Sequence, residues 1–209
     1  EAVVALDKRT GKEVWRVEGV QESWSTPLVV NLPDGGEELV VNMRGKVLGI
    51  DPATGRERWH CTGIKSYVCP AVVAHEGVVY ISGGRPPEML AIRAGGQGDV
   101  TDSHVLWTRK KTAIVGTPLY HDGHLYWINR QAIASCAKAS DGETIYEERL
   151  DVGGRGDKVY ASLVLAGGKL YGVSRQDGTV VLDAGPEFNL VEHNRLGDES
   201  IFNATPVVS

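Results

Sequence analysis

Short runs of alternating apolar and polar residues recur along the chain at a nearly constant spacing. Five runs begin similarly, usually with Ser or Thr, then Pro, then branched apolar residues, at 25–30, 68–73, 116–120, 160–164 and 204–208. Successive runs begin 43, 48, 44 and 44 residues apart. Alternation with period two is typical of half-buried strands, and Pro is tolerated at a strand's first position. The pattern therefore predicts one strand opening per repeat.

Three further strands are predicted in each repeat. Glu76-Gly77, Asp122-Gly123 and Gly167-Gly168 separate the opening from a second apolar run, and such pairs are strong hairpin signals. Third strands are predicted at 46–50, 89–92, 132–136 and 179–182. Fourth strands end at Trp15, Trp59, Trp107 and Tyr146, and the pattern decays near 190–191.

The motif Asp-x-x-Thr-Gly-x-x-x-Trp occurs at 7–15 and again at 51–59. Asp can accept a bond from the backbone two residues on, and Gly can take a positive φ, so the motif predicts a tight turn between two strands. The recurring Trp is expected to be a packing residue, because later repeats replace it with other apolar residues.

Four short antiparallel strands in each repeat of about 44 residues are typical of a β-propeller blade. We therefore predict an all-β propeller of somewhat under five blades, with helix nearly absent. The complete blades are expected at 25–60, 69–108, 116–148 and 160–193, with a half blade at 1–18 and one strand at 204–209. Residues 93–103 form an insertion that lengthens one outer hairpin.

The whole of 1–209 is interpreted as a single propeller domain and as a piece of a longer chain. Its two ends are expected either to close on each other by sharing a blade or to be joined by further blades. Unpaired edge strands would otherwise be open to pairing with another chain.

Charge and composition narrow the function classes. The formal net charge is −5, from 22 basic and 27 acidic residues, which argues against nucleic acid or an anionic membrane surface as a partner. Twenty-six Gly residues suit a turn-rich β protein, and no apolar run reaches the roughly 20 residues of a membrane helix. We expect no membrane insertion in this segment.

These motifs resemble the pyrroloquinoline-quinone-like repeat, which builds quinoprotein alcohol dehydrogenases and the outer-membrane assembly lipoprotein propeller. The resemblance is sharpest at 3–15 and 47–59 and weakest after 180. It implies that Trp15, Trp59 and Trp107 dock between neighbouring blades. A WD40 propeller is disfavoured because no Trp-Asp dipeptide occurs, and kelch rests on single matches such as 81–84.

The resemblance also implies what a dehydrogenase would need: a disulfide between adjacent cysteines, a Trp platform, a Ca²⁺ site and an Asp base. Cys61, Cys69 and Cys136 are not adjacent, and no run of Asp, Asn and Glu concentrates oxygen ligands. We therefore expect no catalytic residue, no cofactor and no metal, and the interpretation leans away from an enzyme. Cys61 and Cys69 either bridge in an oxidising compartment or remain buried thiols, and the thiols are favoured.

Three other motifs have simpler interpretations. His121 and His124 flank an Asp-Gly turn and lack a third ligand nearby in sequence, so a solvated turn is favoured over a zinc site. Residues 95–98 do not lead from a strand into a helix, which disfavours a phosphate loop. Residues 151–157 suggest a polar linker more than a cation site.

An arginine occurs in the turn between the second and third strands of all four complete repeats: Arg44, Arg85, Arg130 and Arg175. The connections between blades carry Trp24, Tyr67, Tyr160 and Phe202, and antiparallel geometry places them on the same face as those turns. Arginine forks suit carboxylate, sulfate or phosphate, and aromatic faces suit sugar rings or peptide side chains. The alternative is that arginine merely decorates solvated turns copied by duplication.

The sequence thus favours a non-catalytic binding or scaffold module for a protein or an anionic polysaccharide, with Arg44, Arg85, Arg130, Arg175, Trp24 and Tyr67 as the candidate ligand-binding residues. The alternative is part of a quinone-dependent dehydrogenase whose cofactor residues lie outside this segment. A sensor domain attached to a kinase would need flanking sequence. Family habit favours an extracytoplasmic location, in the periplasm or at the cell surface.

Overall fold

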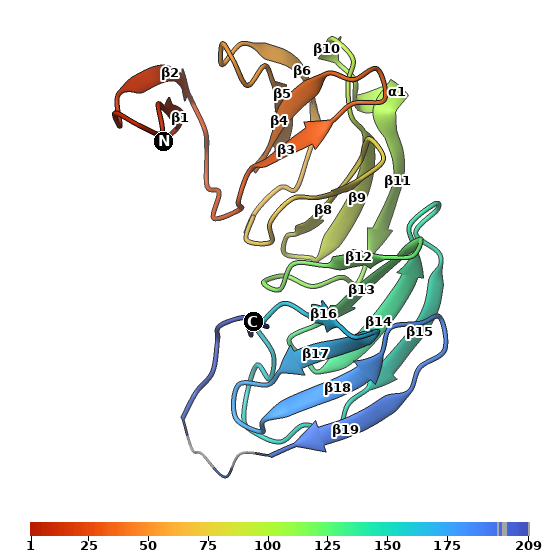
Figure 1. Ribbon diagram of the computed structural model, residues 1–209. Helices are drawn as coiled ribbons and strands as arrows, with labels where there is room; N and C mark the ends of the chain where they lie inside the picture. Colours follow the sequence, from red (N-terminus) through yellow and green to blue (C-terminus); the bar gives the residue numbers. More distant parts are fainter. Residues whose placement is uncertain (196, 198–199, 209) are drawn as a thin grey trace. The chain divides into compact units, whose positions relative to one another are not determined.

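The computed structural model describes residues 1–195, 197 and 200–208, and these residues are built almost entirely from β-strands (Figure 1). The chain divides into two compact units, Glu1–Lys110 and Lys111–Ser209, here called unit 1 and unit 2. Unit 1 holds three sheets and unit 2 holds two. In the described part, no helix has the length and apolar character needed to cross a membrane.

Each sheet of the described chain corresponds to one repeat of the sequence. The first sheet pairs β1 (Ala2–Leu6) with β2 (Glu13–Glu18). The second contains β3 (Leu28–Asn31), β4 (Glu37–Met43), β5 (Lys46–Ile50) and β6 (Glu57–Thr62). The third contains β7 (Val73–His75), β8 (Val78–Gly83), β9 (Glu88–Arg93) and β11 (Val105–Lys110). The fourth contains β12 (Leu119–His121), β13 (His124–Ile128), β14 (Ile133–Lys138) and β15 (Thr144–Arg149). The fifth contains β16 (Val164–Ala166), β17 (Lys169–Val173), β18 (Thr179–Asp183) and β19 (Leu190–Asn194). Within each four-stranded blade, neighbours in the chain pair antiparallel, which confirms the predicted all-β propeller class.

The Asp-x-x-Thr-Gly motif folds as its residues dictate. Asp51 Oδ1 accepts hydrogen bonds from the backbone N–H groups of Ala53 and Thr54, at 2.9 and 3.0 Å. Gly55 takes φ +75°, a conformation that only glycine adopts without strain. The equivalent turn at Asp7 makes the same bonds, so the Asp side chain and the glycine help to set the turn that joins the third and fourth strands.

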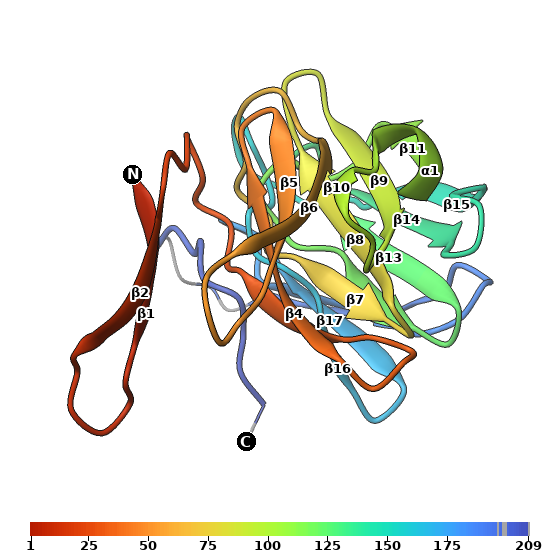
Figure 2. The same ribbon diagram turned by 90° about the horizontal axis from the view of Figure 1, so that it is seen from above.

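The insertion at 93–103 does more than lengthen a hairpin. It forms β10 (Gly98–Asp99), which pairs parallel with β6, and then the four-residue helix α1 (Thr101–His104). Both views place β10 beside β6, although the insertion leaves from β9 of the next blade (Figures 1 and 2). The insertion therefore covers the outer edge of the blade before it.

The core is made of apolar layers between successive blades. In unit 1, Val41, Met43 and Leu48 pack with Val3 and Val17 of the first sheet. A larger layer joins the second and third blades, with members such as Val40, Trp59, Val79 and Ile92. In unit 2, Tyr126, Cys136, Leu170 and Leu182 belong to the layer between the fourth and fifth blades.

The predicted strand openings need correction. The ladders begin later than the Ser/Thr-Pro segments, at Leu28, Val73, Leu119 and Val164. The preceding segments instead contact each other: Ser23 bridges Val68 in parallel, and the Thr117 N–H donates to Ser162 Oγ at 2.9 Å. Pro lacks an N–H, which fits the late start of the ladder after Pro27, Pro70 and Pro118, whereas the opening at 160–164 contains no Pro and also starts late.

The strand predicted at 204–209 is not formed in the described residues 204–208, and Ser209 lies outside them. A strand is held by a neighbouring strand, and none of the described strands pairs with residues 204–208. Val207 is accordingly 90% exposed. The prediction of one domain over 1–209 stays a prediction.

Candidate functional site

All four arginines lie in the turn between the second and third strands of their blades, where the sequence predicts them. In two of these turns the guanidinium stacks on the tyrosine of the connection that enters the same blade. Arg85 lies 4.1 Å from the centroid of the Tyr67 ring, and Arg175 lies 4.5 Å from that of Tyr160. The repeat therefore builds the same cation–π pair twice, once in each unit.

In unit 1 the Glu22 carboxylate links the other turn arginine, Arg44, to the Arg85–Tyr67 pair. Arg44 Nη1 donates to Glu22 Oε2 at 3.0 Å, and the other oxygen, Oε1, accepts the backbone N–H of Tyr67 at 2.9 Å. Glu22 and Tyr67 both have positive φ values, of 36° and 57°, which ordinary residues seldom adopt. The Glu22 carboxylate thus fixes the segment that presents the tyrosine ring.

The corresponding carboxylate in unit 2 is Asp157. It accepts from Arg130 Nη1 at 3.1 Å and from the Tyr160 hydroxyl at 3.0 Å. Arg175 donates to the backbone oxygen of Asp157 and to Asn203 Oδ1, at 3.2 and 2.8 Å. Each unit therefore combines one turn arginine that is paired with a carboxylate and one that is stacked on a tyrosine.

The predicted aromatic residues differ in exposure. Trp24 is 64% exposed, and its ring centroid lies 5.8 Å from that of Tyr67 at an interplanar angle of 59°. Phe202 contributes its backbone N–H to the Arg175 oxygen at 2.9 Å. The structure groups Arg44, Arg85, Trp24 and Tyr67 in unit 1, and it groups the other predicted residues in unit 2. A single face presenting all four arginines stays a prediction.

Sequence reasoning missed the carboxylates. Glu22 lies two residues before Trp24, and Asp157 lies three residues before Tyr160, so an acid shortly before the aromatic residue of a connection was the available signal. It also missed Glu38 of β4, which is fully buried. The two Glu38 oxygens accept from Trp59 Nε1 and from the Gly95 N–H, each at 2.9 Å.

The minor motifs are structural in the described residues. His121 and His124 form the last pair of the β12–β13 hairpin, and no group of three or more His, Cys, Asp or Glu suited to a metal ion occurs in the described chain. The 151–157 linker is tied to the last blade, because Asp177 Oδ2 accepts the Gly153 N–H at 2.6 Å. The three cysteines are free thiols, and burial raises the pKa of Cys61 to about 12.

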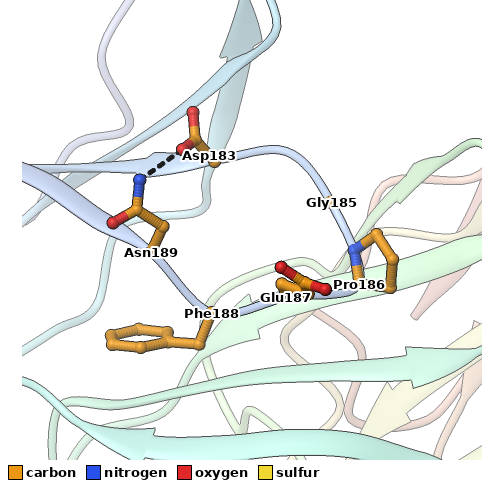
Figure 3. A pocket seen from close by; sticks show the side chains of 6 residues that line it. All are labelled: Asp183, Gly185, Pro186, Glu187, Phe188 and Asn189. Atoms are coloured by element: carbon orange, nitrogen blue, oxygen red, sulfur yellow. Dashed lines mark hydrogen bonds between the residues drawn. The ribbon is translucent and has the colours of Figure 1, made fainter.

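Two hollows lie near charged turns. One, of about 420 Å³, is lined by Arg44 together with Lys46, His60 and Asp99. Another, of about 540 Å³, lies in the β18–β19 turn, where Asn189 faces Asp183 and Phe188 points away from both (Figure 3). Phe188 packs edge-on against Tyr146 at 5.5 Å, which makes this turn a packing feature.

The repeat architecture agrees with known proteins. A family model described as outer membrane protein assembly factor BamB matches residues 1–92. This match supports the resemblance to the pyrroloquinoline-quinone-like repeat over residues 1–92. None of the curated proteins searched has a sequence that matches this chain.

Solved structures of pyrroloquinoline-quinone-like propellers share the fold. BamB from Moraxella catarrhalis superposes with a TM-score of 0.59 at 17% identity, over 99% of this chain and 71% of that one. Quinohemoprotein alcohol dehydrogenase from Comamonas testosteroni gives 0.66 at 16% identity, over 94% of this chain and 40% of that one. A europium-containing methanol dehydrogenase gives 0.70 at 11% identity, over 93% and 47%. The chain thus spans less than half of either dehydrogenase.

The residues of this chain do not fit the quinone site that the resemblance to pyrroloquinoline-quinone-like propellers implies. That site needs two adjacent cysteines, whereas the nearest pair here, Cys61 and Cys69, is eight residues apart and free. The described residues also lack a carboxylate cluster suited to a metal ion.

Proposed function

We propose that this chain is a non-catalytic binding or scaffold module that recognises an acidic protein partner through the arginine-bearing turns of its blades. The supporting observation is the constellation repeated in each unit: a turn arginine stacked on a tyrosine, beside a second turn arginine held by a carboxylate. In each unit one turn arginine is paired with a carboxylate and the other has no carboxylate partner among the described residues, so each cluster offers a positive charge in a chain whose net charge is −5.

The choice of a protein partner is supported by the family model, whose description is that of an outer membrane protein assembly factor. An assembly factor acts on other proteins. The same description supports an extracytoplasmic site of action, in the periplasm or at the cell surface. The repeated tryptophans support a scaffold role, since Trp15 of the first sheet donates to the Pro52 oxygen of the next at 3.0 Å and so docks one blade on another.

An anionic polysaccharide is the second candidate. The observation that favours it is the 64% exposure of Trp24, because an exposed indole face stacks well on a sugar ring. Its anionic groups would bind the same arginines.

The proposal is tested by changing Arg44 and Arg130 together to Ala, one arginine in each unit. Wild type and variant are applied to an array of acidic peptides and an array of acidic glycans. We expect the variant to lose most binding, and the wild-type signal to weaken as salt rises, because exposed charge pairs are screened. Binding that is unchanged in the double variant contradicts the proposal.

The dehydrogenase alternative has its own measurement. Pyrroloquinoline quinone and Ca²⁺ are added to the chain and its melting temperature is followed. Under the proposed function the melting temperature stays constant, whereas a rise of several degrees would favour a cofactor-binding protein.

A further inference from the structure

Arg85 differs from the other turn arginines in what its N–H groups contact. Arg44 donates to Glu22, Arg130 to Asp157, and Arg175 to Asn203 and the Asp157 backbone. Arg85 is exposed, and among the described residues its guanidinium has the Tyr67 ring as a neighbour and no hydrogen-bond acceptor. Among the four turn arginines, Arg85 is therefore the one whose guanidinium fork, the parallel N–H groups, is uncommitted, meaning that it has no hydrogen-bond partner in the described residues.

Stacking leaves that fork available. A guanidinium lying over a ring uses its face, so its N–H groups point outward in the guanidinium plane. In that plane two parallel N–H groups match the two oxygens of a carboxylate. The Tyr67 ring therefore orients Arg85 without consuming its donors.

The backbone under the ring is fixed on three sides. The Tyr67 N–H donates to Glu22, the Tyr67 oxygen accepts the Gly84 N–H at 3.2 Å, and the Val68 oxygen accepts the Trp24 N–H at 2.8 Å. Little conformational entropy remains to be lost here on binding, which favours affinity.

Trp24 supplies an apolar surface beside the fork. Its indole is 64% exposed, and it meets Tyr67 at 59°, so the two rings form a corner and not a flat platform. Exposed Trp and Arg sidechains are the residue types that most often dominate the free energy of protein–protein binding.

We propose that Arg85 binds a carboxylate side chain of an acidic protein segment, and that Trp24 contacts the apolar residue next to that carboxylate. This inference rests on the proposed function and names the contact point in unit 1. Glu22 acts as a positioning residue, since it fixes Tyr67 and neutralises Arg44.

The charge pattern favours a peptide over an anionic polysaccharide. A polysaccharide with one negative charge per sugar needs a row of free cations, whereas this surface offers one uncommitted fork and places the Glu22 carboxylate near it. A segment with a single acidic group beside an apolar side chain meets the fork without approaching Glu22.

The experiment uses the whole chain and three probes: a capped twelve-residue peptide of Gln and Pro with one Glu–Pro pair at its centre (the Glu–Pro peptide), the same peptide with Gln in place of that Glu (the Gln–Pro peptide), and hexagalacturonate. Binding is followed by calorimetry and by the Arg Nε–H and Trp indole NMR signals, assigned by their loss in variants. The variants are Arg85→Gln, Trp24→Ala and, as the matched control, Arg16→Gln, which removes an equal charge from an exposed guanidinium that is paired with Glu13 outside the arginine-bearing turns. Circular dichroism verifies that each variant, altered at an exposed side chain, remains folded.

We expect the Glu–Pro peptide to bind and to shift the Arg85 and Trp24 signals. Arg85→Gln and Trp24→Ala should each weaken binding about tenfold or more, and Arg16→Gln by less than about threefold. The Gln–Pro peptide should not bind.

Three results would overturn the inference. The Glu–Pro peptide does not bind wild type, or it binds Arg85→Gln as tightly as wild type, or hexagalacturonate binds through Arg85 in its place. Loss of binding in Arg130→Gln or Arg175→Gln, with none in Arg85→Gln, would leave the proposed function standing and remove only this assignment. The array experiment on the Arg44/Arg130 double variant decides the proposed function separately.

Discussion

Trp15 and Gly55 contact each other across the first two sheets of unit 1. The Trp15 indole donates to the Pro52 oxygen, and a Cβ added at Gly55 would lie 2.8 Å from the Trp15 ring. Gly55 is therefore required twice, by its φ of +75° and by the ring above it. Gly11, at the same place in the first repeat, has φ +70° and open space around it.

Gly55→Ala and Gly11→Ala separate these two requirements. Both variants should lose about 1 kcal/mol from the strained φ, and Gly55→Ala should lose about 1–3 kcal/mol more from overpacking against Trp15. Urea denaturation of the two variants measures the difference. Equal losses in both would show that Trp15 does not pack against the turn in solution.

Glu38 gives a second test at this scale. In Glu38→Gln one side-chain oxygen remains to accept from the Trp59 and Gly95 N–H groups, and an amide N–H₂ faces the other donor, so we expect a loss of about 1–3 kcal/mol in the free energy of unfolding. The exposed neighbour Glu37→Gln is the control and should change it by less than about 0.5 kcal/mol. If the two variants unfold alike, the Glu38 bonds to Trp59 and Gly95 do not contribute to stability.

Residues within one turn could be predicted from sequence, and residues that meet across blades could not. The Asp7 and Asp51 turns followed from side chains within three positions of each other. Glu38 follows another glutamate next to a loop, a pattern typical of a surface, and only the packing of Trp59 and the insertion over it explains its burial. The same holds for Glu22 and Asp157, whose arginine partners lie 22 and 27 residues away.

At the scale of elements, the insertion pairs with β6 of the preceding blade, a parallel pairing that the antiparallel pattern of the repeats does not predict. Two parallel pairs hold β10, and three further contacts continue the attachment: Val100 is buried, its N–H donates to the His60 oxygen at 2.8 Å, and the Thr62 N–H donates to Thr101 Oγ1 at 3.1 Å. The 48-residue spacing revealed the insertion. It did not reveal its target, because two residues of parallel pairing leave no periodic signal.

Val100→Asp should detach this insertion, because it buries an unpaired charge at the point of attachment. We expect faster hydrogen–deuterium exchange at the Thr62 amide, with the inner strands of the blade little changed. Asp102→Asn, a change on the exposed side of α1, should leave that exchange rate as it is. Unaltered exchange in Val100→Asp would mean that the insertion does not cover β6 in solution.

At the scale of the whole molecule, the period of about 44 residues was enough to predict the fold class, because every repeat keeps enough of its turns and apolar positions to be recognised. The last strand failed because a strand needs its neighbour, a condition that the local sequence does not contain. The sequence predicted which arginines and aromatic residues lie in the turns and connections. It did not predict which hydrogen-bond partner each arginine has, because that depends on contacts between distant segments.

Acid stability is a property of the whole molecule that follows from these turns. The Arg58 guanidinium and the turn N–H groups lower the pKa of Asp51 to about 2, and the bonds from Thr10 lower the pKa of Asp7. A lowered carboxyl pKa contributes stability above the unfolded value of about 3.9, and this contribution is lost as the pH falls through the folded value. Stability should therefore decline from about pH 4 towards about pH 2.

Asp51→Asn should flatten that decline, because an amide does not titrate. Between about pH 4 and about pH 2, the urea midpoint should fall less in Asp51→Asn than in wild type. In Asp102→Asn, the midpoint should fall with pH as steeply as in wild type. An equal slope in all three proteins would exclude Asp51 as a source of acid sensitivity.

The Glu38 carboxylate also constrains how the repeats can diverge. It belongs to one blade, its two donors are Trp59 of that blade and Gly95 of the insertion in the next, and Gly49 has no side chain because a Cβ there would lie 2.1 Å from Trp59 Nε1. These four positions must be inherited together. A descendant that lost the insertion would leave Glu38 Oε1 without its donor. The compensating substitution would then be expected at position 38, in a different repeat from the deletion.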